Sequence, residues 1–416
     1  MSIPLATTTA GLRGAHWKAD QLPRETRVLP TALRTSDGAS ATGFLYQMGQ
    51  EKTVVCLMHP REMLVTQYLV PEILAGGAAV WVMGSRNPGS DLRLEHEKAL
   101  LDLAAGQRFL QERGFEHRVL LGTSGGGPLA AFYVQQAELH PSDRLDKSPA
   151  GKPTGLREAD MPSPEGLILV SSHLGQGPLL LNCIDPAAVD EDDPLETDDS
   201  ISAFNPHNGF REPPESSRYS SDFIARYREA QLQRVQRIDQ RARDLLDRKL
   251  QGRQRFRLSG AREDAVLGAY SPIFQVWRTD ADPRCYDLSL DASDRAYGSL
   301  WGPDPLLSNF GSVAFARVCT PESWLSNWSA LSSNATMAKC APSARIPTLM
   351  IQYTGDNSVF PSEADVLFDW LGASDKTRNM VVGNHHGGPV APGSPNGQPV
   401  AGEHIRAWLE SRGFTR

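Results

Sequence analysis

Short apolar runs alternate with longer amphipathic segments along most of the chain, beginning at Thr53. A short apolar run bounded by turn residues predicts a buried strand, and a longer segment of helical periodicity predicts a helix. Alternating strands and helices are typical of an α/β fold with a mostly parallel central sheet flanked by helices. We predict strands at Thr53–Met58, Ala78–Met83, Arg118–Leu121, Leu167–Val170, Ile346–Tyr353 and Asn379–Val382. The helices are predicted at Met63–Ala75, Leu94–Gly114, Gly126–Leu139, Ser362–Trp370 and Glu403–Ser411.

The regions around this pattern differ in character. The stretch up to about residue 50 predicts a pair of edge strands with a turn at Asp37-Gly38. Residues 141–165 carry Pro, Ser, Lys and Asp without periodicity, which predicts an exposed loop.

The alternation stops after Ser172 and resumes only at Ile346. The interruption includes an acidic run, residues 185–199, with eight acidic and no basic residues, which predicts a solvated or disordered loop. A helical pattern follows over residues 222–257, with Ser220 or Ser221 as its cap, and residues 226–257 hold eleven Lys and Arg against four Asp and Glu. We therefore predict a core in two parts, residues 1–172 and 341–416, interrupted by a large, mainly helical insertion at residues 173–340.

Composition excludes several classes of protein. The formal net charge of -7 argues against a nucleic-acid partner, because such proteins usually carry excess basic charge. No apolar run is long enough to cross a membrane, and the first residues do not resemble a secretory signal. Five scattered cysteines suggest neither a disulfide framework nor a zinc site. We expect a cytoplasmic protein with reduced thiols and no membrane partner.

The segment Gly122-Thr123-Ser124-Gly125-Gly126 is a G-x-S-x-G motif at the point where a predicted strand passes into a predicted helix. A serine at such a sharp turn presents its hydroxyl above the sheet, and the glycines allow strand and helix to approach closely. Two other interpretations are a glycine-rich turn with a bystander serine and a phosphate-binding loop. The second lacks the Lys-Ser/Thr pair of a P-loop and the G-x-G-x-x-G of a dinucleotide site.

A nucleophilic serine needs a base, and the base needs a group that orients it. Asp356 follows the predicted strand Ile346–Tyr353, and His385 and His386 follow the strand Asn379–Val382. The carboxyl ends of parallel strands meet at one edge of a sheet, so these side chains are expected near Ser124. Alternatively, Asp356 is an ordinary turn residue, and at least one of the two histidines has only a structural role.

These features together resemble the α/β-hydrolase superfamily with a large cap domain. The resemblance covers residues 53–172 and 341–416 and rests on the segments GTSGG, TGD and GNHH. It implies Ser124 as nucleophile, Asp356 as the orienting acid and a histidine as base. The family's spacing from Gly383 favours His386, with His385 as the alternative.

The resemblance also implies an oxyanion hole built from backbone N–H groups. The first would be that of Gly125, and the second would come from His59-Pro60-Arg61. Pro60 has no N–H, so Arg61 is the predicted donor, while His59 is predicted to be structural. No cofactor and no metal are expected.

The expected activity is hydrolysis of an ester, a thioester or a related carbonyl compound. Cleavage of C–C bonds and acyl transfer would use the same triad, and a non-catalytic binding protein is a further alternative. The expected partner is a small or medium-sized organic substrate with an apolar portion, since the insertion supplies aromatic residues for a pocket wall. A homodimer is compatible with the sequence. The basic helix either pairs with the acidic run, which we favour, or attracts an anionic substrate.

Overall fold

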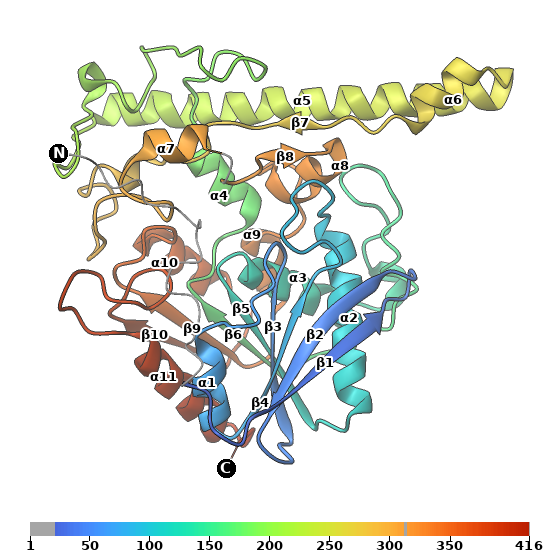
Figure 1. The fold of residues 1–416 in the computed structure, drawn as a ribbon, viewed down its shortest axis with the longest axis vertical. Coiled ribbons are helices and arrows are strands. Elements are labelled where there is room, and N and C mark those ends of the chain that lie inside the picture. Colours follow the sequence, from blue (N-terminus) through green and yellow to red (C-terminus); the bar gives the residue numbers. More distant parts are fainter. Residues whose placement is uncertain (1–20, 312–313, 416) are drawn as a thin grey trace.

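An eight-stranded sheet forms the centre of the molecule in a computed structural model, which describes residues 21–311 and 314–415 (Figure 1). The strand order is β1-β2-β4-β3-β5-β6-β9-β10. β1 and β2 form an antiparallel hairpin, β2 pairs antiparallel with β4, and the other neighbours are parallel. The strands are β1 Arg27–Arg34, β2 Ser40–Gln47, β3 Thr53–His59, β4 Ala79–Gly84, β5 His117–Thr123, β6 Gly166–Val170, β9 Thr348–Tyr353 and β10 Lys376–Val381.

Helices cover both faces of this sheet and bury two separate apolar layers. Successive side chains of a strand point to opposite faces. In β3, Val54 and Cys56 therefore join one layer, while Val55 and Leu57 join the other. The first layer contains α2 His96–Glu112 and α3 Gly126–Glu138, and the second contains α1 Leu69–Ala75 and α11 Gln398–Ser411. The helix α10 Pro361–Trp370 connects β9 to β10 and packs beside α9.

The chain between β6 and β9 adds no strand to the central sheet among its described residues. Most of it lies beyond the carboxyl ends of the parallel strands, across the top of Figure 1, where the long helix α5 runs along the outer side. Its elements are α4 Gln176–Cys183, α5 Ser221–Ser259, α6 Arg262–Ala269, β7 Phe274–Gln275, α7 Pro305–Phe310, β8 Val318–Cys319, α8 Pro321–Ser323 and α9 Met337–Cys340. The insertion has its own apolar core, in which Trp324 and Trp328 are fully buried.

The predicted fold class is confirmed, and the predicted strands and helices are present. Most of their ends shift by one or two residues, while α11 begins at Gln398 instead of Glu403. The predicted hairpin turn is confirmed where Thr35 and Ala39 close the loop around Gly38, while residues 1–20 lie outside the described residues. Ser220 is the cap of α5, because its hydroxyl accepts the amide of Phe223.

One predicted helix is much shorter than expected. We predicted it from Met63, but α1 begins at Leu69. The residues before it form a loop, and Leu64 and Gln67 of this loop line the central cavity described below. Leu64 of this segment therefore lies in a cavity wall instead of on a helix face.

No helix in residues 21–311 and 314–415 combines the length and the apolar character that a membrane span needs. All five cysteines are buried and unpaired.

Candidate active site

Ser124 occupies a strained turn between β5 and α3. Its φ angle is 55°, in the left-handed region that residues with a side chain rarely adopt. Its amide donates to the carbonyl of Val170 in the neighbouring strand, and its carbonyl accepts the amide of His173. Such a conformation persists only where the surroundings hold it, and it places Ser124 in the lining of the cavity.

The glycines around Ser124 are required by close contacts. A Cβ on Gly122 would lie 2.5 Å from the Cα of Gly127, and one on Gly126 would lie 2.7 Å from the carbonyl oxygen of Met58. A Cβ on Gly127 would lie 1.9 Å from the Oγ of Ser172. β5, α3 and the end of β6 therefore meet at a distance that only glycine allows, as the motif predicted.

Three side chains form a continuous hydrogen-bonded chain at this edge of the sheet. The Oγ of Ser124 lies 3.1 Å from the Nε2 of His385, and the Nδ1 of His385 lies 2.9 Å from each carboxylate oxygen of Asp356. The Oδ1 of Asp356 also accepts the amides of Ser358 and Val359 at 2.8 and 2.9 Å. With the carboxylate fixed in this way, Nδ1 of His385 carries the proton and Nε2 is the acceptor that faces Ser124.

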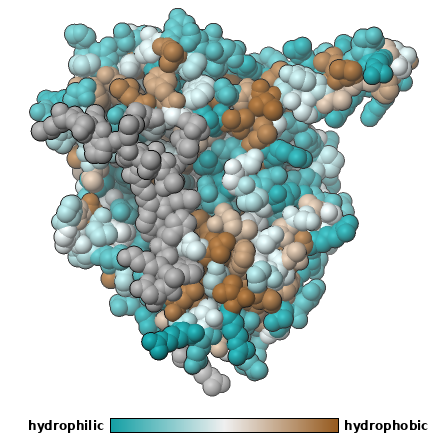
Figure 2. Space-filling model, in the orientation of Figure 1, coloured by the Kyte–Doolittle hydropathy of each residue, from teal (hydrophilic) through white to brown (hydrophobic). Residues whose placement is uncertain are grey.

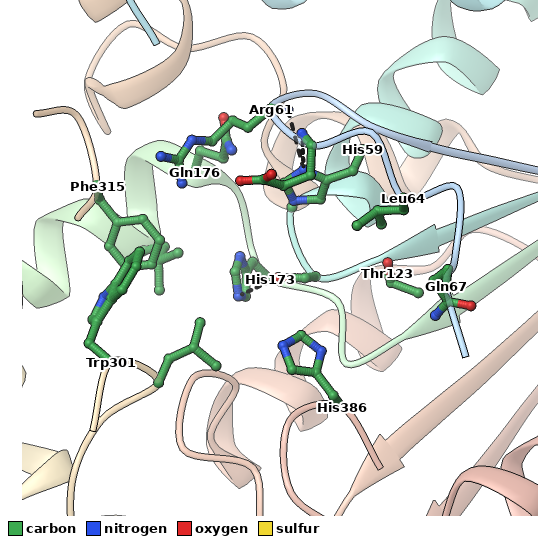
Figure 3. A pocket seen from close by; sticks show the side chains of 15 residues that line it. His59, Arg61, Leu64, Gln67, Thr123, His173, Gln176, Trp301, Phe315 and His386 are labelled. Carbon is green, nitrogen blue, oxygen red and sulfur yellow. Dashed lines mark hydrogen bonds between the residues drawn. The ribbon is translucent and has the colours of Figure 1, made fainter. Parts of the chain in front are cut away.

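The structure brings His385, and not His386, to Ser124 and Asp356. The turn begins at Asn384, whose Oδ1 accepts the amides of His386 and Gly388 at 3.0 Å each. This turn directs His385 inward, where it is 3% exposed, and places the ring of His386 against the ring of His385 at a centroid distance of 4.8 Å. Our preference for His386 was therefore wrong in position by one residue, because spacing from Gly383 does not show where the turn begins. His386 instead lines the cavity (Figure 3).

A second imidazole reaches Ser124 that the sequence analysis did not single out. The Nε2 of His173 lies 3.2 Å from the Oγ of Ser124 and 3.0 Å from the Oγ of Ser358. Its ring stacks on that of His385 at 5.5 Å, and burial lowers its pKa well below the ordinary value. Since the hydroxyl proton of Ser124 goes to His385, the neutral His173 donates from Nε2 to one of the two serine oxygens. Its position three residues after the end of β6 could have indicated that it lies at the same sheet edge as Ser124.

The predicted second oxyanion donor does not point into the cavity. The amide of Arg61 donates to the Nδ1 of His59 at 3.2 Å, and the amide of Glu62 donates to the same atom at 3.1 Å. The guanidinium of Arg61 is bound to Asp91, with its Nε 2.6 Å from Oδ1. Arg61 therefore lies at the cavity, as predicted, but its backbone N–H is already engaged. The amide of Gly125 follows Ser124 at the start of α3, as predicted, with no acceptor among the described residues.

The cavity in front of Ser124 is mainly apolar. It has a volume of about 640 Å³, counted to include its open mouth. Figure 3 shows Trp301 and Phe315 at one end and Leu64 and Gln67 at the other, with His386 facing Arg61 and His59 across the cavity. Leu179 and Leu300 complete the apolar wall. Among the aromatic residues of the insertion, Trp301 and Phe315 line the cavity, whereas Trp324 and Trp328 are fully buried in the core of the insertion.

No group of three or more His, Cys, Asp and Glu side chains in the described part of the chain is arranged to hold a metal ion. The basic helix is partly paired with the acidic run: Arg234 binds Glu191 at 2.7 Å, and Arg241 binds Asp192 at 2.9 Å.

The strand order, the serine turn after β5 and the later positions of Asp356 and His385 define an α/β-hydrolase fold. A comparison of the sequence with protein-family models and with curated proteins finds no match. Among solved structures, the chain is similar to the esterase domain of a Rhodothermus marinus protein, at 11% identity and a TM-score of 0.42, covering 92% of this chain and 98% of the other. It is also similar to an esterase of Pyrococcus furiosus, at 10% identity, a TM-score of 0.41 and coverage of 95% and 94%. A monoacylglycerol lipase of Paleococcus ferrophilus matches at 13% identity, a TM-score of 0.39 and coverage of 92% and 99%.

Proposed function

We propose that this protein is a serine hydrolase that cleaves an ester bond in a small or medium-sized organic substrate. The observation that supports this proposal is the chain from Ser124 through His385 to Asp356, with contacts of 3.1 and 2.9 Å. A serine hydroxyl hydrogen-bonded to an imidazole, which is itself oriented by a buried carboxylate, is the arrangement that makes serine a nucleophile.

The reaction would proceed through an acyl-enzyme. The Oγ of Ser124 attacks the ester carbonyl carbon while its proton passes to the Nε2 of His385. The resulting imidazolium is stabilised by Asp356 through the Nδ1–H. When the C–O bond to the alcohol breaks, the alcohol oxygen takes the proton from Nε2. A water molecule then gives a proton to the same nitrogen and attacks the acyl carbon. As the bond from this carbon to Oγ breaks, Oγ takes the proton back from Nε2, which releases the carboxylic acid and restores Ser124.

The lining of the cavity favours a substrate with one apolar portion. Trp301, Phe315 and Leu300 come from the insertion and form an apolar end, and the charge of Arg61 is paired with Asp91. In this proposal, residues 173–340 act as a cap that encloses the substrate. The expected substrate is therefore an uncharged ester with an aliphatic or aromatic group that fits this end.

Two measurements on the intact protein test the proposal. A series of p-nitrophenyl esters, from acetate to octanoate and phenylacetate, should show turnover with a maximum at an intermediate size. Ser124→Ala provides the blank and should lower turnover by several orders of magnitude. A fluorophosphonate probe should label Ser124, as located by mass spectrometry of the digested protein. If the probe labels no residue while the protein is folded, the hydrolase proposal is wrong and a binding role replaces it.

A further inference from the structure

The imidazole of His59 has one nitrogen fixed by its own loop and the other directed at the nucleophile turn. Its Nδ1 accepts two backbone amides, those of Arg61 and Glu62, at 3.2 and 3.1 Å. A nitrogen that accepts two N–H groups cannot carry a proton itself, so the proton of the neutral ring lies on Nε2. Burial and the nearby Arg61 lower the pKa of His59 to about 3, so the ring remains neutral at any ordinary working pH.

The protonated Nε2 lies next to the amide that follows the nucleophile. A Cβ placed on Gly125 would be 3.0 Å from the Nε2 of His59. This nitrogen has no hydrogen-bond partner among the described residues, and His59 is part of the cavity lining together with Ser124 and Gly125. A neutral N–H donor therefore stands unused beside the atom that a substrate carbonyl must approach.

We propose that the Nε2–H of His59 is the second donor of the oxyanion hole and acts together with the amide of Gly125. This inference rests on the proposed function, and it replaces the structural role predicted for His59. Side-chain donors can serve as well as backbone amides, provided that they are held in place before the reaction. The amides of Arg61 and Glu62, which would otherwise be the backbone donors of this loop, here fix the tautomer and the orientation of the imidazole.

The test compares His59→Leu with His59→Gln, because glutamine keeps an N–H donor of similar reach. In His59→Leu we expect kcat to fall about 100-fold to 1,000-fold, the range observed when one oxyanion donor is removed, with KM changed only a few-fold. His59→Gln should retain a larger part of kcat. The inhibition constant of a trifluoromethyl ketone, whose adduct with Ser124 carries an oxyanion, should rise in parallel with the loss of kcat/KM.

The controls separate this inference from the proposed function. Circular dichroism and thermal melting must show that each variant is folded. If Ser124→Ala is inactive and a folded His59→Leu keeps more than a third of wild-type kcat, the oxyanion role is wrong while the hydrolase proposal survives. If His59→Leu and His59→Gln lose the same activity and the inhibitor binds both as tightly as wild type, His59 has only a structural role. If Ser124→Ala remains active, the proposed function itself fails.

An independent observation concerns the outer end of the insertion, where α5 and α6 extend beyond the body of the molecule (Figures 1 and 2). We call residues 250–270 the arm. The last apolar residues of α5 that pack on the core of the insertion are Leu245 and Leu246. Beyond them the two helices pack on each other through Gly252 and Gly268, where an added Cβ on Gly252 would lie 2.8 Å from the backbone nitrogen of Gly268.

The arm is too small to bury its own apolar side chains. Its exposed apolar residues are Leu250, Phe256, Leu258, Val266 and Tyr270, of which Leu258 is 90% exposed. Helices of this length are marginal in water without a packed face, and such side chains grouped together mark an interaction surface. The arm is also basic, since residues 250–270 hold four Arg against Glu263 and Asp264, and Asp264 is paired with Arg255.

A surface of opposite charge lies on the same molecule. We call residues 189–199 the acidic loop. It holds seven acidic residues and no basic one, and it exposes Leu195 by 75% and Val189 by 51%. The loop is fixed over the middle of α5, because Glu191 binds Arg234 and Asp192 binds Arg241. Arm and loop thus each combine exposed apolar side chains with charge of opposite sign.

We propose that the arm of one molecule docks on the acidic loop of a second copy, giving a two-fold dimer with antiparallel α5 helices. A two-fold interface requires a surface that contains both complementary parts. Both lie along α5, because the acidic loop is bound over its middle and the arm forms its end. The centres of loop and arm along α5, near residues 238 and 255, are separated by about 26 Å at 1.5 Å per residue. A two-fold axis near residue 246 therefore places each arm over the loop of the partner at the same time.

Sedimentation velocity with the full chain tests this arrangement. The wild type should be a dimer at micromolar concentration in low salt, and its dissociation constant should rise about 10-fold or more in about 0.5 M salt because the charges are screened. Leu258→Glu should be monomeric, and so should the reversal Asp193→Lys with Glu196→Lys. Combining that reversal with Arg253→Glu and Arg257→Glu should restore the dimer. Activity on a small ester serves as the control for folding, since none of these residues lines the cavity.

Several outcomes would overturn the dimer. A wild type that stays monomeric up to about 100 μM excludes it, as does a dimer that persists in Leu258→Glu. If the wild type is monomeric but floats with vesicles of anionic lipid, the occupant of the arm is a membrane surface and not a second copy.

Discussion

Three buried histidines make the stability of this protein sensitive to acid. Burial lowers the pKa of His59 to about 3, that of His96 to about 4 and that of His173 well below its usual value. In the unfolded chain a histidine has a pKa of about 6.5. When the pH falls from 7 to 5, the unfolded chain binds protons that the folded protein does not, so folding stability decreases. This contribution is complete above pH 6.5 and is lost as the pH falls towards the folded pKa values.

The size of the effect follows from the same values. Protonation of one unfolded histidine between pH 7 and pH 5 lowers the free energy of unfolding by about 2 kcal/mol. For His59 and His96 together the loss is about 4 kcal/mol, and His173 acts in the same direction. Asp280, whose pKa burial raises to about 6, acts in the opposite direction. Single domains are typically stable by about 5–15 kcal/mol, so a loss of this size is readily measured by unfolding.

Urea unfolding at pH 7, 6 and 5 measures this loss, and one substitution isolates a single histidine. His96→Gln should lower the difference in unfolding free energy between pH 7 and pH 5 by about 2 kcal/mol, whatever its effect at pH 7. His140→Gln, which makes the same substitution at an exposed histidine, is the matched control. If His96→Gln and His140→Gln show the same difference as wild type, His96 is protonated in the folded protein and the reasoning fails.

The remaining predictions concern the triad, the serine turn and the surface charges. His385→Ala should approach the low turnover of Ser124→Ala, and His386→Ala should keep most of its activity; the reverse result in an ester assay would return the role of base to His386. Gly127→Ala should lower the free energy of unfolding by about 1–3 kcal/mol, because its Cβ would overlap the side chain of a neighbouring serine. Gly49→Ala, with open space around it, is its control in urea unfolding, and equal stability of the two variants would contradict the contact. The value of kcat/KM for neutral and anionic esters should change little between low and about 0.5 M salt, since Arg61 at the cavity is paired with Asp91 and the basic helix is partly paired with the acidic run; a steep fall for the anionic ester alone would show steering. Exhaustive EDTA treatment should leave the activity unchanged, and a loss reversed by zinc would disprove a metal-independent triad.

Features set by local patterns were predictable from the sequence. The strands of the central sheet are apolar on both faces, as in β3 and β4, so each appears as a continuous apolar run. The serine turn was predictable for a similar reason, because its glycines and its position between strand and helix all lie within one short segment. Asp356 followed from the order of the strands, since the end of β9 must lie at the same sheet edge as Ser124.

Features set by tertiary contacts were not predictable. The choice between His385 and His386 depends on where Asn384 begins a turn, and neighbouring residues of a turn point in different directions. His173 is placed by a contact between the end of β6 and the serine turn, in which its amide donates to the carbonyl of Ser124. A local sequence pattern does not indicate such a contact. The amide of Arg61 donates to the imidazole of His59, and this contact depends on the orientation of a side chain in a loop. The sequence had predicted a helix that begins two residues later, at Met63.

The insertion leaves the sheet at β6 and returns at β9, and these two strands are hydrogen-bonded neighbours. The entropy of closing a loop grows only with the logarithm of its length, so replacing a six-residue connection by one of nearly 180 residues costs about 3 kcal/mol. This entropy is the main effect of the insertion on the sheet, because the pairing of β6 with β9 does not depend on the structure of the chain between them. Segments of different size and composition could therefore be exchanged at this point while Ser124 and Asp356 keep their separation, so that substrate range and bond-breaking chemistry can change independently of each other.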